Sequence, residues 1–207
     1  MRINESTALV DTDFVIHIAK IKRDCEKICD LLREVFLRLE VDAAVHPLVY
    51  DHEMPKTDEI INKFFDDDII ARPSFTEIFD GCDNKDAYYT YVVSELYCRF
   101  KGLYQESDYQ GLDYHDVYTY WEKGESLGEI HSIALCMVFC CGMFLSDDGD
   151  SKQIEKFARE VCTGTLRVYN RKDIISIAQE QGFNLFGNRE DRRAFAYTVA
   201  DFDDEDF

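Results

Sequence analysis

Short apolar runs alternate with helix-periodic stretches at both ends of this chain, and the alternation limits the folds that are open to it. Residues 7–10 (TALV) and 41–45 (VDAAV) are short and apolar, as buried strands are. Apolar residues between them recur at the three- and four-residue spacing of a helix with one buried face. They are Cys25, Ile28, Cys29, Leu32, Val35, Phe36 and Leu39.

The same alternation returns after residue 127. Apolar spacing from Ile130 to Cys141 predicts a helix, and we expect Gly142 to end it. The patterns that follow predict a strand at 143–146 (MFLS), a helix around 154–161, a strand at 165–170 (TLRVYN) and a helix at 172–182 that Gly182 stops. Strands separated by helices are typical of a parallel sheet. The predicted fold class is therefore α/β, as a three-layer α/β/α sandwich with a mostly parallel central sheet.

The middle of the chain, residues 56–126, is less regular. DEIINKFF (58–65) and YYTYVVSELYCRF (88–100) have helical character, with turn-forming residues between them and a tyrosine-rich acidic stretch after them. Hydrophobic residues make up 46% of the chain, which is enough for one core. We expect a single domain over residues 1–200 with a helical insertion at 56–126. The end of the chain, 201–207, has five acids in seven residues and predicts a disordered acidic tail.

Charge and cysteine usage narrow the class of protein. The net charge of -19 repels phosphate, which argues against a sequence-independent nucleic-acid coat, although a bound cation can reverse the sign within one cleft. No CxxC pair occurs among the eight cysteines. The pairs Cys25/Cys29 and Cys136/Cys140 fall within apolar periodic runs, and we expect them to be small buried hydrophobes. A polar N-terminus and the lack of an 18-residue apolar run predict a reduced, cytoplasmic protein without a membrane segment.

Acidic residues follow the predicted strands. Asp11 comes directly after the first strand, and Asp147, Asp148 and Asp150 come after the strand at 143–146. Because the carboxyl ends of parallel strands meet at one edge of a sheet, these acids can share a site. Clustered carboxylates repel one another unless a cation joins them, and hard cations such as Mg²⁺ and Mn²⁺ prefer oxygen ligands.

Two further acids lie on short or newly begun helices. Glu53, with Asp51 two residues earlier, belongs to the helix after the second strand, and Glu129 opens the helix after residue 127. Each has an ordinary explanation, because acids are favoured in the first turn of any helix and on solvated helix faces. With Asp11 and Asp148 they make a set of four oxygen donors for a divalent metal.

Basic residues follow both acidic strand ends, where they could contact phosphates. They are Lys20, Lys22, Arg23, Lys27, Lys152, Lys156 and Arg159. The interpretation that we favour is that they are ordinary solvated faces paired with neighbouring acids.

Four stretches in one order resemble the PIN-domain nucleases, in particular the toxin-like branch of toxin–antitoxin systems. They are ALVDTDFVIHIAKI, HPLVYDHEM, LGEIHSIALCMVF and GMFLSDDGDSK, and the later CTGTLRVYNRKDIISIAQEQGF is also similar to that branch. The similarity covers roughly residues 7–55 and 127–183.

The resemblance implies a site and an activity. It makes Asp11, Glu53, Glu129 and Asp148 the four metal carboxylates, with Ser146 orienting the site. Asp147 and Asp150 would complete a second metal position or support the first, and Asp51 is a rival to Glu53. The implied activity is endoribonuclease cleavage of RNA that depends on Mg²⁺ or Mn²⁺. The implied partners are RNA, an antitoxin-like protein and a second copy of the chain in a homodimer.

Two alternatives stay open. The sequence ALVDTDFV also resembles phosphatases of the haloacid-dehalogenase type, in which Asp11 would be the nucleophile and Asp13 the general acid. The other alternative is a non-catalytic PIN-like interaction module whose tyrosine-rich middle segment binds a protein partner.

Overall fold

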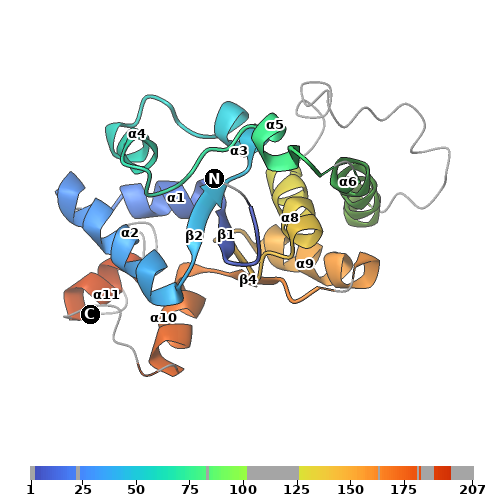
Figure 1. Cartoon of the computed structure of the whole chain (residues 1–207). Coiled ribbons are helices and arrows are strands. Elements are labelled where there is room, and N and C mark those ends of the chain that lie inside the picture. Colours follow the sequence, from blue (N-terminus) through green and yellow to red (C-terminus); the bar gives the residue numbers. More distant parts are fainter. Residues whose placement is uncertain are drawn as a thin grey trace.

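The computed structural model describes residues 3–21, 24–82, 84–101, 126–162, 164–180, 182 and 189–196. The tyrosine-rich stretch after residue 101 and the predicted acidic tail at 201–207 lie outside the described residues. The arrangement of the elements is shown in Figure 1.

Four short strands form one sheet in which every neighbouring pair is parallel. The strands are β1 (Thr7–Val10), β2 (Asp42–Val45), β3 (Met143–Leu145) and β4 (Arg167–Tyr169), in the spatial order β2-β1-β3-β4. In the register, Val10 lies opposite both Val45 and Leu145. The four predicted strands are confirmed, and their carboxyl ends meet at one edge of the sheet.

Helices connect the strands and cover both faces of the sheet, which confirms the predicted three-layer α/β/α fold (Figure 1). The helices are α1 (Thr12–Ala19), α2 (Cys25–Leu39), α3 (Pro47–His52), α4 (Glu59–Asp66), α5 (Phe75–Phe79), α6 (Lys85–Lys101), α8 (Leu127–Phe139), α9 (Gly149–Val161), α10 (Arg171–Glu180) and α11 (Arg189–Ala196). The helices predicted at 58–65 and 88–100 are present as α4 and α6.

Side chains alternate between two cores, one on each face of the sheet. Ala8 and Val10 of β1 pack with α1, α2, α4, α10 and α11, whereas Leu9 packs with α5, α6, α8 and α9. All three side chains are fully buried. Burial on both faces explains why the central strands β1 and β3 do not alternate apolar with charged residues.

The end of α8 differs from the prediction. The helix stops at Phe139, and Cys140 takes the left-handed conformation with φ 60°, so Gly142 does not end it. Cys140 is also exposed, which makes its predicted burial wrong. Cys25 is half-buried, while Cys29 and Cys136 are buried as expected. All eight cysteines lie in the described part of the chain, and their thiols form no disulfide there.

None of the helices in the described part of the chain has the length and apolar composition needed to cross a membrane.

Candidate active site

Asp11 is the most constrained acid of the carboxyl edge. It directly follows the central strand β1, and its backbone N–H donates to the carbonyl oxygen of Leu145 at 2.9 Å. Its side chain is only 2% exposed and accepts a hydrogen bond from the Ser146 hydroxyl at 2.9 Å. Although Asp11 caps α1, its carboxylate makes no side-chain cap bond to that helix. The carboxylate is therefore directed toward the sheet edge.

Glu53 lies at the end of α3 and reaches the same edge. Its carboxylate accepts a hydrogen bond from the Thr12 hydroxyl, next to Asp11, at 2.8 Å. A Cβ atom added at Gly128 would lie 2.6 Å from Oε1 of Glu53. Real Cβ contacts are not this short, so the first turn of α8 accommodates the Glu53 carboxylate only because residue 128 is glycine. The glycine of the Gly128-Glu129 pair thus has a steric explanation.

Asp51 has a different environment from Glu53. Its side chain is exposed and forms an ion pair with Lys56, with 3.9 Å between Oδ1 and Nζ. Of the two rivals on this helix, only Glu53 contacts the elements that carry the other site acids.

Glu129 completes the group from the first turn of α8. Burial, together with the negative charges of Asp11, Glu53 and Asp148, raises its pKa to about 8. Burial likewise raises the pKa of Asp11 to about 7, with contributions from Asp13 and Glu53. The pKa of Glu53 is raised by burial and by Asp13. Glu129 therefore lies within electrostatic range of Asp11, Glu53 and Asp148, and Asp11 lies within range of Glu53.

Asp13 is a fifth member that the metal-ligand prediction left out. Burial raises its pKa, and Asp148 and then Asp147 raise it further, while His17 and Lys20 act in the opposite direction. Its position, two residues after Asp11 in the first turn of α1, was the available signal.

The acidic loop after β3 is organised by hydroxyl groups. Ser146 lies between Asp11 and Asp148, since its oxygen accepts from the Asp148 backbone N–H at 3.1 Å while its hydroxyl donates to Asp11. Asp148 caps α9 by accepting from the backbone N–H of Asp150 at 2.8 Å. Asp150 in turn accepts from the Ser126 hydroxyl at 2.8 Å. Asp148 and Asp150 therefore already have structural partners.

Asp147 points into a separate ion-pair network. Oδ2 contacts Nδ1 of His17 at 2.8 Å and accepts from Nε of Arg171, and Oδ1 accepts from the Arg171 backbone N–H. Arg171 is 4% exposed and also donates to the carbonyl of Phe195 on α11 at 3.2 Å. Both carboxylate oxygens of Asp147 are thus used in contacts with α1 and with the start of α10, and the charge of Asp147 is compensated by Arg171.

The donor set is suitable for a hard divalent cation, because it consists of carboxylate oxygens with hydroxyl groups behind them. However, no group of three or more His, Cys, Asp or Glu side chains within the described residues is arranged so that it could hold a metal ion as it stands. Binding of an ion would therefore require the carboxylates to move closer together.

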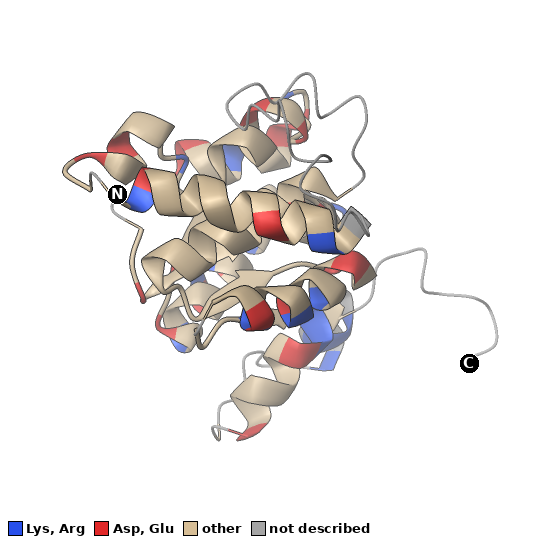
Figure 2. Ribbon diagram, turned by 90° about the vertical axis from the view of Figure 1, so that its right-hand side faces the viewer, with Lys and Arg blue, Asp and Glu red and all other residues tan. Residues whose placement is uncertain are grey.

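Two of the basic residues near the acidic loop are paired with acids. Lys152 donates to Asp173 at 2.7 Å, and Arg159 pairs with Glu155 one turn earlier. Figure 2 shows lysine and arginine interspersed with acidic residues along the helices that face the viewer. Two of the predicted phosphate contacts, Lys22 and Arg23, lie outside the described residues.

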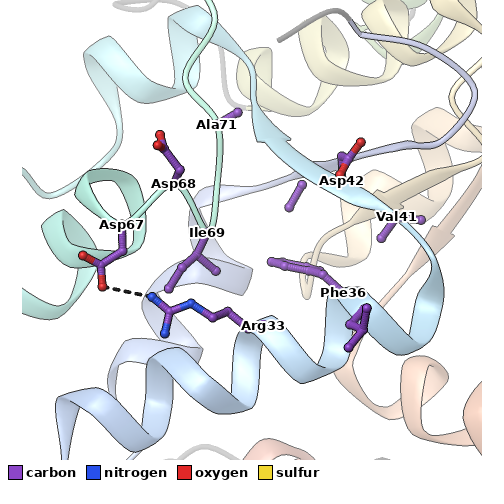
Figure 3. Close-up of a pocket in the computed structure, with 10 residues that line it drawn as sticks. Arg33, Phe36, Val41, Asp42, Asp67, Asp68, Ile69 and Ala71 are labelled. Atoms are coloured by element: carbon purple, nitrogen blue, oxygen red, sulfur yellow. Dashed lines mark hydrogen bonds and ion pairs between the residues drawn. The ribbon is translucent and has the colours of Figure 1, made fainter.

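A hollow of about 380 Å³ lies elsewhere, between α2 and the chain after α4 (Figure 3). Phe36 and Ile69 line it together with Arg33, which pairs with Asp67 at 3.1 Å. It also contains Asp42, the first residue of β2. The hollow is therefore at the amino end of a strand, whereas ligands of parallel α/β folds bind at the carboxyl ends.

Comparison of the chain with protein-family models, with curated proteins and with solved structures found no match. The fold and the site together define a three-layer α/β/α protein with an edge of buried, uncompensated carboxylates. Its chemistry has to be inferred from that edge.

The raised pKa values predict how stability depends on pH. Asp11 and Glu129 keep their protons in the folded state at pH values where the unfolded chain has lost them. The free energy of unfolding without metal should therefore fall as the pH rises from about 4 to about 8, and then level off. We expect Asp11→Asn to flatten this slope and to stabilise the protein at pH 8 by about 2 kcal/mol. Urea unfolding at pH 5, 6.5 and 8 measures both effects.

The matched control is Asp51→Asn, which removes the same charge from an exposed position. It should leave the slope as in the wild type. An unchanged slope in Asp11→Asn would contradict the assignment of the repulsion to the buried edge.

Proposed function

We propose that the protein is a divalent-metal-dependent phosphodiesterase that cleaves RNA, of the PIN-like type that the sequence resembles. Asp11, Glu53 and Glu129 would hold Mg²⁺ or Mn²⁺, with Asp148 as the fourth carboxylate. The observation that carries the proposal is the burial of several mutually repelling carboxylates at the carboxyl edge of a parallel sheet. A cation would relieve that repulsion, and no described basic side chain makes a hydrogen bond or ion pair to Asp11, Glu53 or Glu129.

The residues around the carboxylates have defined tasks in this proposal. A bound divalent cation supplies Lewis acidity and an activated water to the phosphodiester. The Ser146 hydroxyl orients the Asp11 carboxylate, and the Thr12 hydroxyl orients that of Glu53. Burial keeps Asp11 and Glu129 partly protonated near neutral pH, so protons leave these two groups when a cation binds.

A bound cation would also explain how a strongly acidic protein can bind RNA. A molecule with a net charge of -19 repels RNA at long range, and positive charge within the site would have to come from the metal. We place the protein in the cytoplasm, with RNA as its substrate. An antitoxin-like partner and a homodimer are expectations that come from the resemblance alone.

Metal titration tests the proposal directly. Isothermal calorimetry with Mn²⁺ at pH 7.5 should detect binding to the wild type and at least about tenfold weaker binding to Asp11→Asn and to Glu129→Gln. The same variants should lose metal-dependent cleavage of a labelled RNA. Asp51→Asn changes the net charge equally and should bind Mn²⁺ like the wild type. If Asp51→Asn weakens binding as much as Asp11→Asn, then the ion is attracted by overall charge and the site is wrong.

Gly128→Ala tests the position of Glu53 in the metal site without a large effect on the stability of the fold. The added methyl group meets the end of the flexible Glu53 side chain, so the carboxylate moves aside at little cost to packing. Alanine is also favoured over glycine within a helix. We expect the thermal midpoint to stay close to that of the wild type, while Mn²⁺ affinity falls about tenfold because Glu53 is displaced.

The control for this variant is Gly142→Ala, because a Cβ atom at Gly142 has nothing within 4 Å. It should leave Mn²⁺ affinity unchanged. Wild-type affinity in Gly128→Ala would show that the position of Glu53 does not matter for the metal.

The phosphatase alternative is favoured by one observation, the electrostatic coupling of Asp13 to Asp11 and Asp148. If Asp13 is a general acid, Asp13→Asn should reduce hydrolysis of a small phosphomonoester as strongly as Asp11→Asn. We expect instead that Asp13→Asn keeps most of the RNA cleavage and that neither the wild type nor the variants hydrolyse p-nitrophenyl phosphate. Parallel assays of both substrates decide between the two reactions.

A further inference from the structure

Three buried aromatic side chains form a hydrogen-bonded chain on the far side of the α3–α8 contact. Nε2 of His46 lies 3.0 Å from the hydroxyl oxygen of Tyr89, and the same oxygen lies 2.6 Å from Nδ1 of His131. None of the three residues is more than 4% exposed. Buried hydrogen bonds of this kind are directional and tolerate little displacement.

The direction of each hydrogen bond follows from one backbone contact. The N–H of Leu48 donates to Nδ1 of His46 at 3.2 Å, so the proton of the neutral ring is on Nε2. Nε2 of His46 then donates to the Tyr89 oxygen, and the Tyr89 hydroxyl donates to Nδ1 of His131. Burial lowers the pKa of both histidines and raises that of Tyr89, which keeps all three rings neutral.

Two of the three residues come from the elements that carry site acids. His46 follows β2 and caps α3, and α3 ends at Glu53. His131 is on α8, two residues after Glu129, and its ring centroid is 5.6 Å from that of His46. Tyr89 is on α6, which packs along α8. The Tyr89 hydroxyl therefore connects the start of α3 to the first turns of α8.

The separation of α3 and α8 is defined at two points. One is the steric contact of the Glu53 carboxylate with Gly128, and the other is the His46–Tyr89–His131 chain. The first contact ends on a flexible side chain and sets only a lower limit. The second sets a fixed distance, because the Tyr89 hydroxyl is hydrogen-bonded to both histidine rings at once.

We propose that Tyr89, with His46 and His131, is a positioning group that sets the distance between the Glu53 and Glu129 carboxylates. The inference rests on the proposed function and assigns a role to α6, the last described helix of the predicted insertion. Tyr89 acts through the two helices and does not touch the metal or the substrate.

Tyr89→Phe tests the proposal, because it keeps the ring and removes only the hydroxyl group. We expect Mn²⁺ affinity, measured by calorimetry at a temperature where every variant is fully folded, to fall about tenfold. The matched control is Val92→Ala on the same helix, where a fully buried apolar side chain is truncated. Val92→Ala should lower the thermal midpoint at least as much as Tyr89→Phe and leave Mn²⁺ affinity unchanged.

A pair of substitutions at His131 tests the hydrogen bond itself. Oδ1 of asparagine occupies the place of Nδ1 of histidine and can accept from Tyr89, whereas leucine cannot. His131→Asn should therefore keep Mn²⁺ affinity close to that of the wild type, and His131→Leu should lose about as much as Tyr89→Phe.

The outcomes separate the inference from the function on which it rests. Wild-type affinity in Tyr89→Phe overturns the positioning role and leaves the metal site intact. An equal loss of affinity in Tyr89→Phe and Val92→Ala also overturns it, because general loosening of α6 would then explain both. Absence of Mn²⁺ binding to the wild type contradicts the proposed function, and the positioning role then fails with it.

Discussion

Burial of a parallel sheet on both faces is the constraint from which the rest of this structure follows. The strands are joined by helices, so every strand points the same way and its last residue reaches the same edge. The residues that come next at this edge are Asp11, His46, Ser146 and Asn170. All four are polar, but Asp11 is the only carboxylic acid among them. It follows the central strand β1, and its position in the middle of the sheet accounts for its burial.

The acids of this edge are of two kinds: one is paired with a basic side chain, and the others lie near further carboxylates. Asp147 and Asp148 are adjacent, yet Asp147 shares a buried network with Arg171 while Asp148 faces the carboxylates of α1 and α8. A chain that needed only stability could pair the other acids as it pairs Asp147. Sites where a protein keeps an unfavourable local arrangement are often functional, because the cost is offset elsewhere in the fold. Asp147 and Asp148 thus differ although they are neighbours in the chain. This difference is the strongest argument that the other acids of the edge, within the described part of the chain, are left without a lysine or arginine partner for a functional reason.

Much of the fold could be predicted from the sequence, because apolar periodicity reports which face of an element is buried. The strands around Leu9 and Phe144 and the helix α2 are of this kind. The end of α8 was mispredicted because a glycine, Gly142, was favoured over Cys140 as the left-handed residue, although tertiary contacts can impose that conformation on any side chain.

The site was predictable only as a set of strand ends. The sequence does not show that Glu53 and not Asp51 turns inward, because the deciding contact is with Gly128, which lies far along the chain. Asp13 was undervalued because its coupling to Asp148 depends on how α1 and β3 meet. The Tyr89 hydroxyl pairs with residues more than forty positions away on either side, and spacing along a sequence contains no information about such pairs.

The start of α8 is where these interactions converge. One helical turn makes three different contacts here. The backbone at Gly128 leaves room for the Glu53 carboxylate, Glu129 faces the other carboxylates, and His131 is hydrogen-bonded to Tyr89. Ser126, just before this turn, has a left-handed φ of 65°, which is unfavourable for any residue other than glycine. The Ser126 hydroxyl donates a hydrogen bond to Asp150. The acidic loop thus stabilises the strained entry into α8. A displacement of this turn would disturb three neighbours at once, so the Glu129 carboxylate and the hydrogen bond between His131 and Tyr89 cannot move independently.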